Sequence, residues 1–139
     1  MSDAALVEKK LAFIETCVRE LRELARPRLL ADDVREARFV EHTLQIAIQA
    51  ALDVASQIVS ARRLGEPQTN RELFDLLRKA GIVEPPLAEV LYAMAGFRNV
   101  VVHGYLEVDV TIVEDILQNR LADLLAFVET IRRSLANAG

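Results

Sequence analysis

The sequence predicts an all-α fold, an up-and-down four-helix bundle with one additional short helix. Apolar residues recur at helical spacing along almost the whole chain, and no segment alternates polar and apolar residues as a strand would. Of the 139 residues, 52% are hydrophobic, which is enough for a core without metals or disulfides. We therefore expect residues 1–139 to form one domain.

The first half of the chain predicts two long helices. The apolar residues of the first step by three or four and form one stripe: Val7, Leu11, Ile14, Val18, Leu21 and Ala25. Pro27 ends or kinks this helix, and Asp32 and Asp33 are candidate N-caps for the second. The core line of the second helix is Val40, Leu44, Ala47, Ala51, Ala55 and Ile58. Further apolar residues widen this surface, which predicts a central helix or one covered by a second subunit.

A short helix and another long one follow the breaker at residues 64–68. Thr69 and Glu72 have the spacing of a capping box, and Gly81 is placed to close the short helix. The next helix opens with Pro85 and Pro86, which the first turn of a helix tolerates because its N–H groups have no partner there.

The final helix is predicted to begin near Asp109 or Thr111. Thr111 and Glu114 again have capping-box spacing. The apolar stripe of this helix is Val113, Leu117, Leu121, Leu124, Val128, Ile131 and Leu135.

The charge and the cysteine count restrict the class of protein. A net charge of −4 and a pI of about 5.2 give no overall attraction for nucleic acid. The single cysteine, Cys17, excludes an intrachain disulfide and a multi-cysteine metal site, and its apolar neighbours predict a buried thiol. The charged start of the chain has no apolar signal core, and no apolar run approaches a membrane span. We therefore expect a cytoplasmic protein.

The segment "FRNVVVHGYLEVD", residues 97–109, interrupts the fourth predicted helix with polar residues. Arg98 continues a core line that runs through Leu87, Leu91 and Met94, where a charge is costly unless it is paired or lies in a cleft. An arginine whose stem covers apolar surface at a helix end is the ordinary alternative.

His103 follows Arg98 by five residues, which turns a continuous helix by about 140°. The two side chains therefore converge only if the helix bends or stops before Gly104, a residue suited to the left-handed conformation that ends helices. A polar helix cap at His103 and a packed ring at Tyr105 are ordinary alternatives. Because the chain has only two histidines and two tyrosines, their occurrence beside Arg98 favours a functional site.

The spacing of these residues resembles a known motif. Arg98, four residues, His103, one residue and Tyr105 are similar to the Arg-x4-His-x-Tyr motif of HepT-like toxins, which belong to the HEPN superfamily of helical ribonucleases. The surrounding segment, including Asn99, and the second helix, "RFVEHTLQIAIQAALDVASQIVS", resemble the family as well. The helix order and the chain length are also similar to the family.

The resemblance implies a metal-independent endoribonuclease that needs no cofactor. Arg98 and His103 would be catalytic, because RNA supplies its own 2′-hydroxyl nucleophile, an imidazole can move protons, and a guanidinium can stabilise the charged phosphorane. Asn99 would support them by positioning a phosphate oxygen or holding the imidazole, although an ordinary capping amide is an equal alternative. The family is dimeric, which implies a homodimer whose two motifs line one groove.

The resemblance also implies a toxin that works with a minimal nucleotidyltransferase antitoxin. This partner would transfer AMP from ATP to Tyr105, and the added anion would block the groove and neutralise its charge. The alternative function is a non-catalytic helical subunit that binds substrate for a nucleotidyltransferase.

Other polar residues have ordinary explanations. His42 is expected on the surface or in a helix contact. Arg26, Arg28, Arg35 and Arg38 cluster at the first interhelical turn, where a solvated charged turn is favoured over a contact with RNA or an acidic partner.

Overall fold

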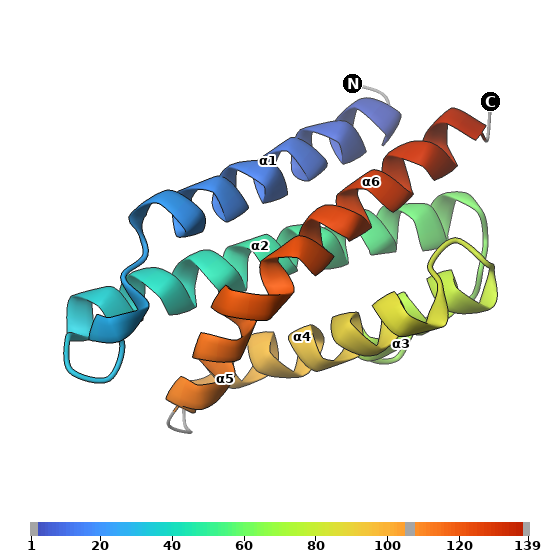
Figure 1. The fold of residues 1–139 in the computed structure, drawn as a ribbon. Coiled ribbons are helices and arrows are strands. Elements are labelled where there is room, and N and C mark those ends of the chain that lie inside the picture. Colours follow the sequence, from blue (N-terminus) through green and yellow to red (C-terminus); the bar gives the residue numbers. More distant parts are fainter. Residues whose placement is uncertain (1–2, 105–107, 138–139) are drawn as a thin grey trace.

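The computed structural model describes residues 3–104 and 108–137, and in these residues it contains helices and no strand (Figure 1). The helices are α1 (Asp3–Leu24), α2 (Val34–Ala61), α3 (Asn70–Lys79), α4 (Pro85–His103), α5 (Val110–Asp115) and α6 (Leu121–Asn137). A 3₁₀ turn, Pro27–Leu29, joins α1 to α2, and a π-helical segment, Ile116–Arg120, joins α5 to α6. The long helices run up and down and α3 is the additional short one, so the predicted fold class is confirmed.

Capping side chains set where α2 and α3 begin. Of the two candidate caps for α2, Asp33 is the one used: its carboxylate accepts the backbone N–H groups of Arg35, at 2.8 Å, and Glu36, at 3.3 Å. Thr69 caps α3 by accepting the N–H of Glu72 at 3.2 Å. These bonds satisfy donors that a helix start leaves without partners.

The other predicted helix boundaries are also found. The Glu72 carboxylate accepts the N–H of Gln68 at 2.6 Å, one residue before the cap, and so completes a variant of the predicted capping box. α3 ends at Lys79, and Gly81 follows with a positive φ of 77°. α4 begins at Pro85, as predicted.

The final helix differs from the prediction in two respects. Its cap is Asp109, whose carboxylate accepts the N–H of Thr111 at 2.9 Å, so the predicted capping box at Thr111 and Glu114 is wrong. The helix is also divided by the π-helical segment. Its wider i→i+5 turn shifts the apolar face, so that Ile116 is buried where the regular spacing placed Leu117, which is only partly buried.

α2 lies at the centre of the bundle and contacts α1, α3, α4 and α6. All six residues of its predicted core line are buried. By length and composition alone α2 is long and apolar enough to cross a membrane, because it contains an 18-residue window with a mean hydropathy of 1.3. This differs from the expectation that no apolar run approaches a membrane span. However, 56% of this apolar window is buried inside the bundle, which accounts for its composition.

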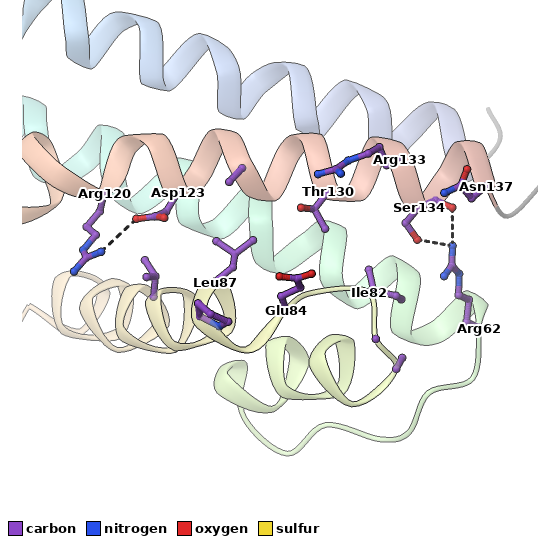
Figure 2. A pocket seen from close by; sticks show the side chains of 15 residues that line it. Arg62, Ile82, Glu84, Leu87, Arg120, Asp123, Thr130, Arg133, Ser134 and Asn137 are labelled. Atoms are coloured by element: carbon purple, nitrogen blue, oxygen red, sulfur yellow. Dashed lines mark hydrogen bonds and ion pairs between the residues drawn. The ribbon is translucent and has the colours of Figure 1, made fainter.

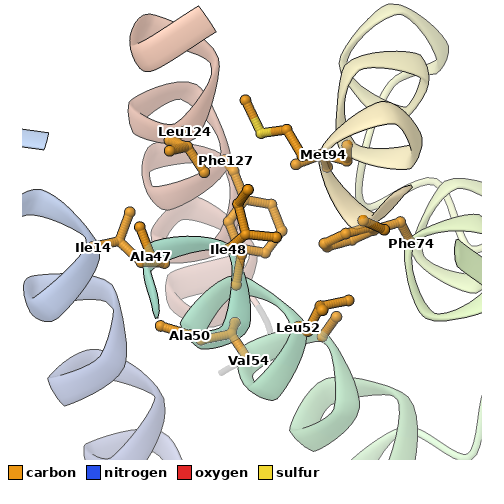
Figure 3. Close-up of a cluster of buried hydrophobic side chains, with 14 of the residues drawn as sticks. Ile14, Ala47, Ile48, Ala50, Leu52, Val54, Phe74, Met94, Leu124 and Phe127 are labelled. Carbon is orange, nitrogen blue, oxygen red and sulfur yellow. The ribbon is translucent and has the colours of Figure 1, made fainter. Parts of the chain in front are cut away.

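Apolar side chains from α1, α2, α3, α4 and α6 meet in the core (Figure 3). Phe127 of α6 packs edge-on against Phe74 of α3, with ring centroids 5.9 Å apart and an interplanar angle of 80°. The predicted burial of Cys17 is confirmed. This burial, reinforced by the negative charge of Glu20, raises the pKa of the Cys17 thiol to about 11, so the thiol stays protonated at neutral pH.

α3 and α4 form an antiparallel pair, and this pairing positions the candidate site. Asn70, at the start of α3, lies beside Asn99 near the end of α4. One and a half turns further along α3, Asp75 lies beside Tyr92. The C-terminal end of α4 lies at the same end of the bundle as the α1–α2 connection and α5 (Figure 1).

Candidate active site

The last two turns of α4 carry the predicted site. Leu91 and Met94 are buried on the core line of α4, and the helix remains regular up to His103. Gly104 ends it in the left-handed conformation, with φ 67° and ψ 4°, and the N–H of Gly104 donates to the Val100 carbonyl at 3.2 Å. The predicted left-handed glycine is therefore confirmed.

The helix does not bend before it stops. Because α4 is unbroken between Arg98 and His103, the two side chains leave the helix axis about 140° apart, as the sequence predicts for a helix that continues without a bend. Arg98 is half-buried on the inner side of the helix end, whereas His103 is exposed on its last residue. The two residues lie at one end of one helix but point in different directions.

The guanidinium of Arg98 is held by an amide. Its Nη1 donates to Oδ1 of Asn99 at 3.1 Å. Its Nε is buried, and among the described residues this nitrogen has no hydrogen-bond partner. No described carboxylate pairs with Arg98 either. The part of the chain that the structure describes thus leaves Arg98 a half-buried cation that no described carboxylate neutralises, which suits a phosphate ligand.

Asn99 accepts a second hydrogen bond. Nδ2 of Asn70, the first residue of α3, donates to the same Oδ1 at 3.1 Å. Asn70 is absent from the sequence-based prediction, because a polar residue beside the cap Thr69 looks like an ordinary helix start. The two asparagines are 29 residues apart, and only the antiparallel pairing of α3 with α4 brings them together.

The two tyrosines have different positions. Tyr105, the predicted modification site, lies outside the described residues. Tyr92 is only 8% exposed, and its hydroxyl donates to Asp75 at 2.9 Å while accepting from Nε of Arg78 at 3.1 Å. Hydrogen bonds from Arg78, Tyr92 and Lys79 hold the pKa of the Asp75 carboxyl well below its usual range. This burial fits the expectation that Tyr92 is a poor target for modification.

A groove of about 990 Å³ lies between the start of α4 and α6, away from the motif (Figure 2). Two of its three arginines have partners. Arg62 donates to Ser134, at 3.0 Å to the hydroxyl, and Arg120 pairs with Asp123 at 3.6 Å. Because the carboxylates of Glu84 and Asp123 also line this groove, it is a weaker candidate for binding an anion than the surroundings of Arg98.

The remaining polar candidates are exposed. His42 lies on the surface of α2, as predicted. In the first turns of α2, Arg38 is exposed and pairs with Glu41 at 3.7 Å, and in the connection before α2 the backbone N–H of Arg26 donates to Glu36 at 2.7 Å. This arrangement agrees with a solvated charged turn.

Comparisons with known proteins identify the family. A family model described as ribonuclease HepT-like matches residues 14–131. The chain is 30% identical to the mRNA nuclease HepT of Shewanella oneidensis over 128 residues, which cover 91% of this chain and 96% of that protein. It is 29% identical to the tRNA nuclease HepT of Aphanizomenon flos-aquae over 109 residues, which cover 77% of this chain and 74% of that protein.

The fold agrees with a solved structure of the same kind. The tri-AMPylated HEPN toxin of Shewanella oneidensis, in complex with an MNT antitoxin, superposes with a TM-score of 0.87 at 30% identity. The alignment covers 96% of this chain and 99% of that chain. Since the family model spans most of the sequence and a relative at 30% identity covers almost all of it, the chain belongs to the ribonuclease HepT-like family and is a ribonuclease by class.

Proposed function

We propose that the chain is the toxin of a two-protein system and cleaves RNA without a metal ion, with Arg98 and His103 as its catalytic residues. The observation that carries this proposal is the state of Arg98. Its guanidinium is half-buried, hydrogen-bonded to the neutral amide of Asn99, and not neutralised by a described carboxylate. Such a cation suits a phosphate that gains negative charge during reaction.

The reaction requires two proton transfers, one from the attacking 2′-hydroxyl and one to the departing 5′-oxygen. The 2′-oxygen of a ribose attacks the adjacent phosphorus and loses its proton to a base, while the bond from phosphorus to the 5′-oxygen breaks and that oxygen gains a proton. The products are a 2′,3′-cyclic phosphate and a 5′-hydroxyl. The imidazole of His103 serves as the base or the acid, and Arg98 stabilises the charge on the phosphorane.

A homodimer explains how these groups act on one phosphate. Within one chain Arg98 and His103 point about 140° apart, and each chain supplies only one imidazole from the motif. A two-fold axis near the end of α4 would place the His103 of one copy opposite the Arg98 of the other. It would also provide one imidazole for each of the two proton transfers.

Mixed dimers test this arrangement. We expect the Arg98→Ala and His103→Ala chains each to be inactive alone, because each dimer then lacks one kind of group entirely. Co-expressed with different affinity tags and purified as the mixed species, they should regain measurable RNA cleavage, since one arginine and one histidine remain across the axis. A purified chain that stays monomeric in light scattering at micromolar concentration would contradict the dimer.

The proposed partner is a minimal nucleotidyltransferase antitoxin that adds AMP to Tyr105. The complex of the similar Shewanella oneidensis toxin with its MNT antitoxin, in which the toxin is tri-AMPylated, supports this part of the proposal. The burial of Tyr92, whose hydroxyl is held in a hydrogen bond with Asp75, supports Tyr105 as the target in preference to Tyr92. We further propose that the chain is a single domain and acts in the cytoplasm.

Expression of the chain alone distinguishes a toxin from a non-catalytic subunit. We expect wild-type expression to stop growth and degrade cellular RNA, and expression of the soluble His103→Ala variant to do neither, because the variant lacks the proton-transfer group. Growth curves and RNA integrity measure both effects. Normal growth and intact RNA with the wild-type chain would favour the non-catalytic substrate-binding subunit.

A further inference from the structure

The start of α3 makes a polar contact with the candidate site that the motif does not include. Oδ1 of Asn99 accepts from two donors, Nη1 of Arg98 and Nδ2 of Asn70, each at 3.1 Å. Both asparagines and the arginine are partly buried. The guanidinium of Arg98, on α4, is therefore linked to α3 through the amide of Asn99.

We propose that Asn70 is a positioning residue of the active site, which holds Asn99 and, through it, the guanidinium of Arg98. This inference rests on the proposed function, because it assigns Asn70 a role in the same reaction. Asn70 itself donates to Asn99, and among the described residues it forms no hydrogen bond with Arg98. Its effect on the reaction is accordingly indirect.

The amide of Asn99 has two orientations, and Asn70 favours one of them. With Oδ1 toward Arg98, the amide accepts from both neighbours and its Nδ2 points away from them. With the amide reversed, its NH₂ group would face the guanidinium of Arg98, which can only donate, so the Arg98 hydrogen bond would be lost, and Asn70 could keep its bond only by reversing its own amide. In the orientation found, Asn70 donates to the same oxygen and so holds Asn99 with its oxygen toward Arg98. An Nδ2 that points away remains available to an acceptor such as a phosphate oxygen.

Asn70 lies on a rigid element, as a positioning residue should. Thr69 caps α3 directly before it, and the Glu72 carboxylate fixes the preceding turn through Gln68. Phe74, one turn further along α3, is fully buried in the core. Because α3 is anchored on both sides of Asn70, the Nδ2 group is held at a fixed place relative to α4.

A second contact between the same two helices provides a matched control. The hydroxyl of Tyr92 on α4 donates to Asp75 on α3 at 2.9 Å. It joins α3 to α4 as the asparagine pair does, but it lies two turns before Arg98 on α4 and contacts no motif residue. If Asn70 only fastened the helices together, Tyr92→Phe and Asn70→Ala would have similar effects on catalysis.

Single-turnover kinetics with a short RNA separate these roles. Asn70→Ala is expected to lower the rate at saturating RNA by roughly tenfold to a hundredfold, because a misplaced guanidinium stabilises the transition state less. The concentration of RNA for half-maximal rate should change less than the rate itself. Tyr92→Phe should retain the wild-type rate. Adding Asn70→Ala to the Asn99→Ala variant should lower the rate at saturating RNA only a little further, since Asn70 acts through Asn99.

Nuclear magnetic resonance measures the arginine without any need for activity. The Nε–H signal of Arg98, assigned by its loss in Arg98→Lys, should shift or broaden in Asn70→Ala and remain in place in Tyr92→Phe. Thermal unfolding of all variants checks that each is folded. The signal reports the position and mobility of the guanidinium directly, so a merely structural role of Asn70 elsewhere would not change it.

Each outcome has a separate meaning. An unchanged Arg98 signal in folded Asn70→Ala, or equal rate losses in Asn70→Ala and Tyr92→Phe, would overturn the positioning role while leaving the ribonuclease proposal intact. A wild-type chain that does not cleave RNA, with Arg98→Ala no different, would overturn the proposed function and with it any part of Asn70 in that reaction. A changed signal together with a selective loss of rate would support both.

Discussion

Arg98→Ala is expected to reduce the rate of RNA cleavage by about a thousandfold, the scale of losing a group that stabilises transition-state charge. The physical reason is that Arg98 is a half-buried cation, which among the described residues has no carboxylate partner and is hydrogen-bonded to the neutral amide of Asn99. Removing it takes the positive charge from the place where the phosphorane would form. Cleavage of a labelled RNA by the purified variant measures the loss.

The matched control for this prediction is Arg133→Ala. Arg133 is an exposed arginine on α6, beside the groove between α4 and α6 and away from the motif. Its removal changes the net charge of the chain by the same amount, so a general weakening of RNA binding would appear in both variants. Equal losses in the two variants would contradict a specific role for Arg98. The circular dichroism spectrum should remain helical in each.

Tyr105→Phe should abolish modification by the partner transferase while retaining nuclease activity. The substitution removes only the hydroxyl that would receive AMP, and no other hydroxyl of this kind is suited to replace it, because that of Tyr92 is buried against Asp75. Each AMP adds a negatively charged phosphodiester that would compete with RNA for Arg98. Mass spectrometry after co-expression with the transferase and ATP measures the added mass.

The controls for this prediction separate modification from simple binding. Tyr92→Phe should be modified as fully as the wild-type chain. Tyr105→Phe co-expressed with the transferase should remain more toxic than the wild-type chain, although binding of the transferase without modification would still inhibit it in part. AMP-sized additions on Tyr92 or elsewhere, with Tyr105 unchanged, would show that the modification site has been assigned wrongly.

The long helices were predictable because their signals are local. Stripes at three- and four-residue spacing, the proline that opens α4 and the left-handed Gly104 all follow from the properties of neighbouring residues. The same applies to the cap Asp33, although sequence alone did not separate it from Asp32. These features depend on backbone chemistry within a few residues.

The errors arose where competing local bonds or tertiary contacts decide the structure. Of the two predicted starts of the final helix, Asp109 forms the cap, since its carboxylate accepts the N–H of Thr111, and the capping box expected at Thr111 and Glu114 does not form. The π-helical segment rotates the apolar face so that Ile116 packs inward, which a regular stripe does not anticipate.

The candidate site was predictable only in part. Arg98 and Asn99 were identified from their resemblance to a motif, and their hydrogen bond depends on neighbouring positions on one helix turn. Asn70 was missed because its contact spans 29 residues and exists only once α3 packs antiparallel to α4. The direction of His103 was left open, because sequence does not show whether α4 stays regular up to its last residue.

Cleavage of a defined RNA in the presence of excess EDTA tests the central claim most directly. The account predicts that cleavage persists in EDTA and leaves a 2′,3′-cyclic phosphate and a 5′-hydroxyl, because the 2′-oxygen attacks and Arg98 and His103 supply the charge and the proton transfers. Mass spectrometry of the fragments identifies both ends. Cleavage that is lost in EDTA and restored by magnesium, or fragments that carry a 3′-hydroxyl, would contradict it.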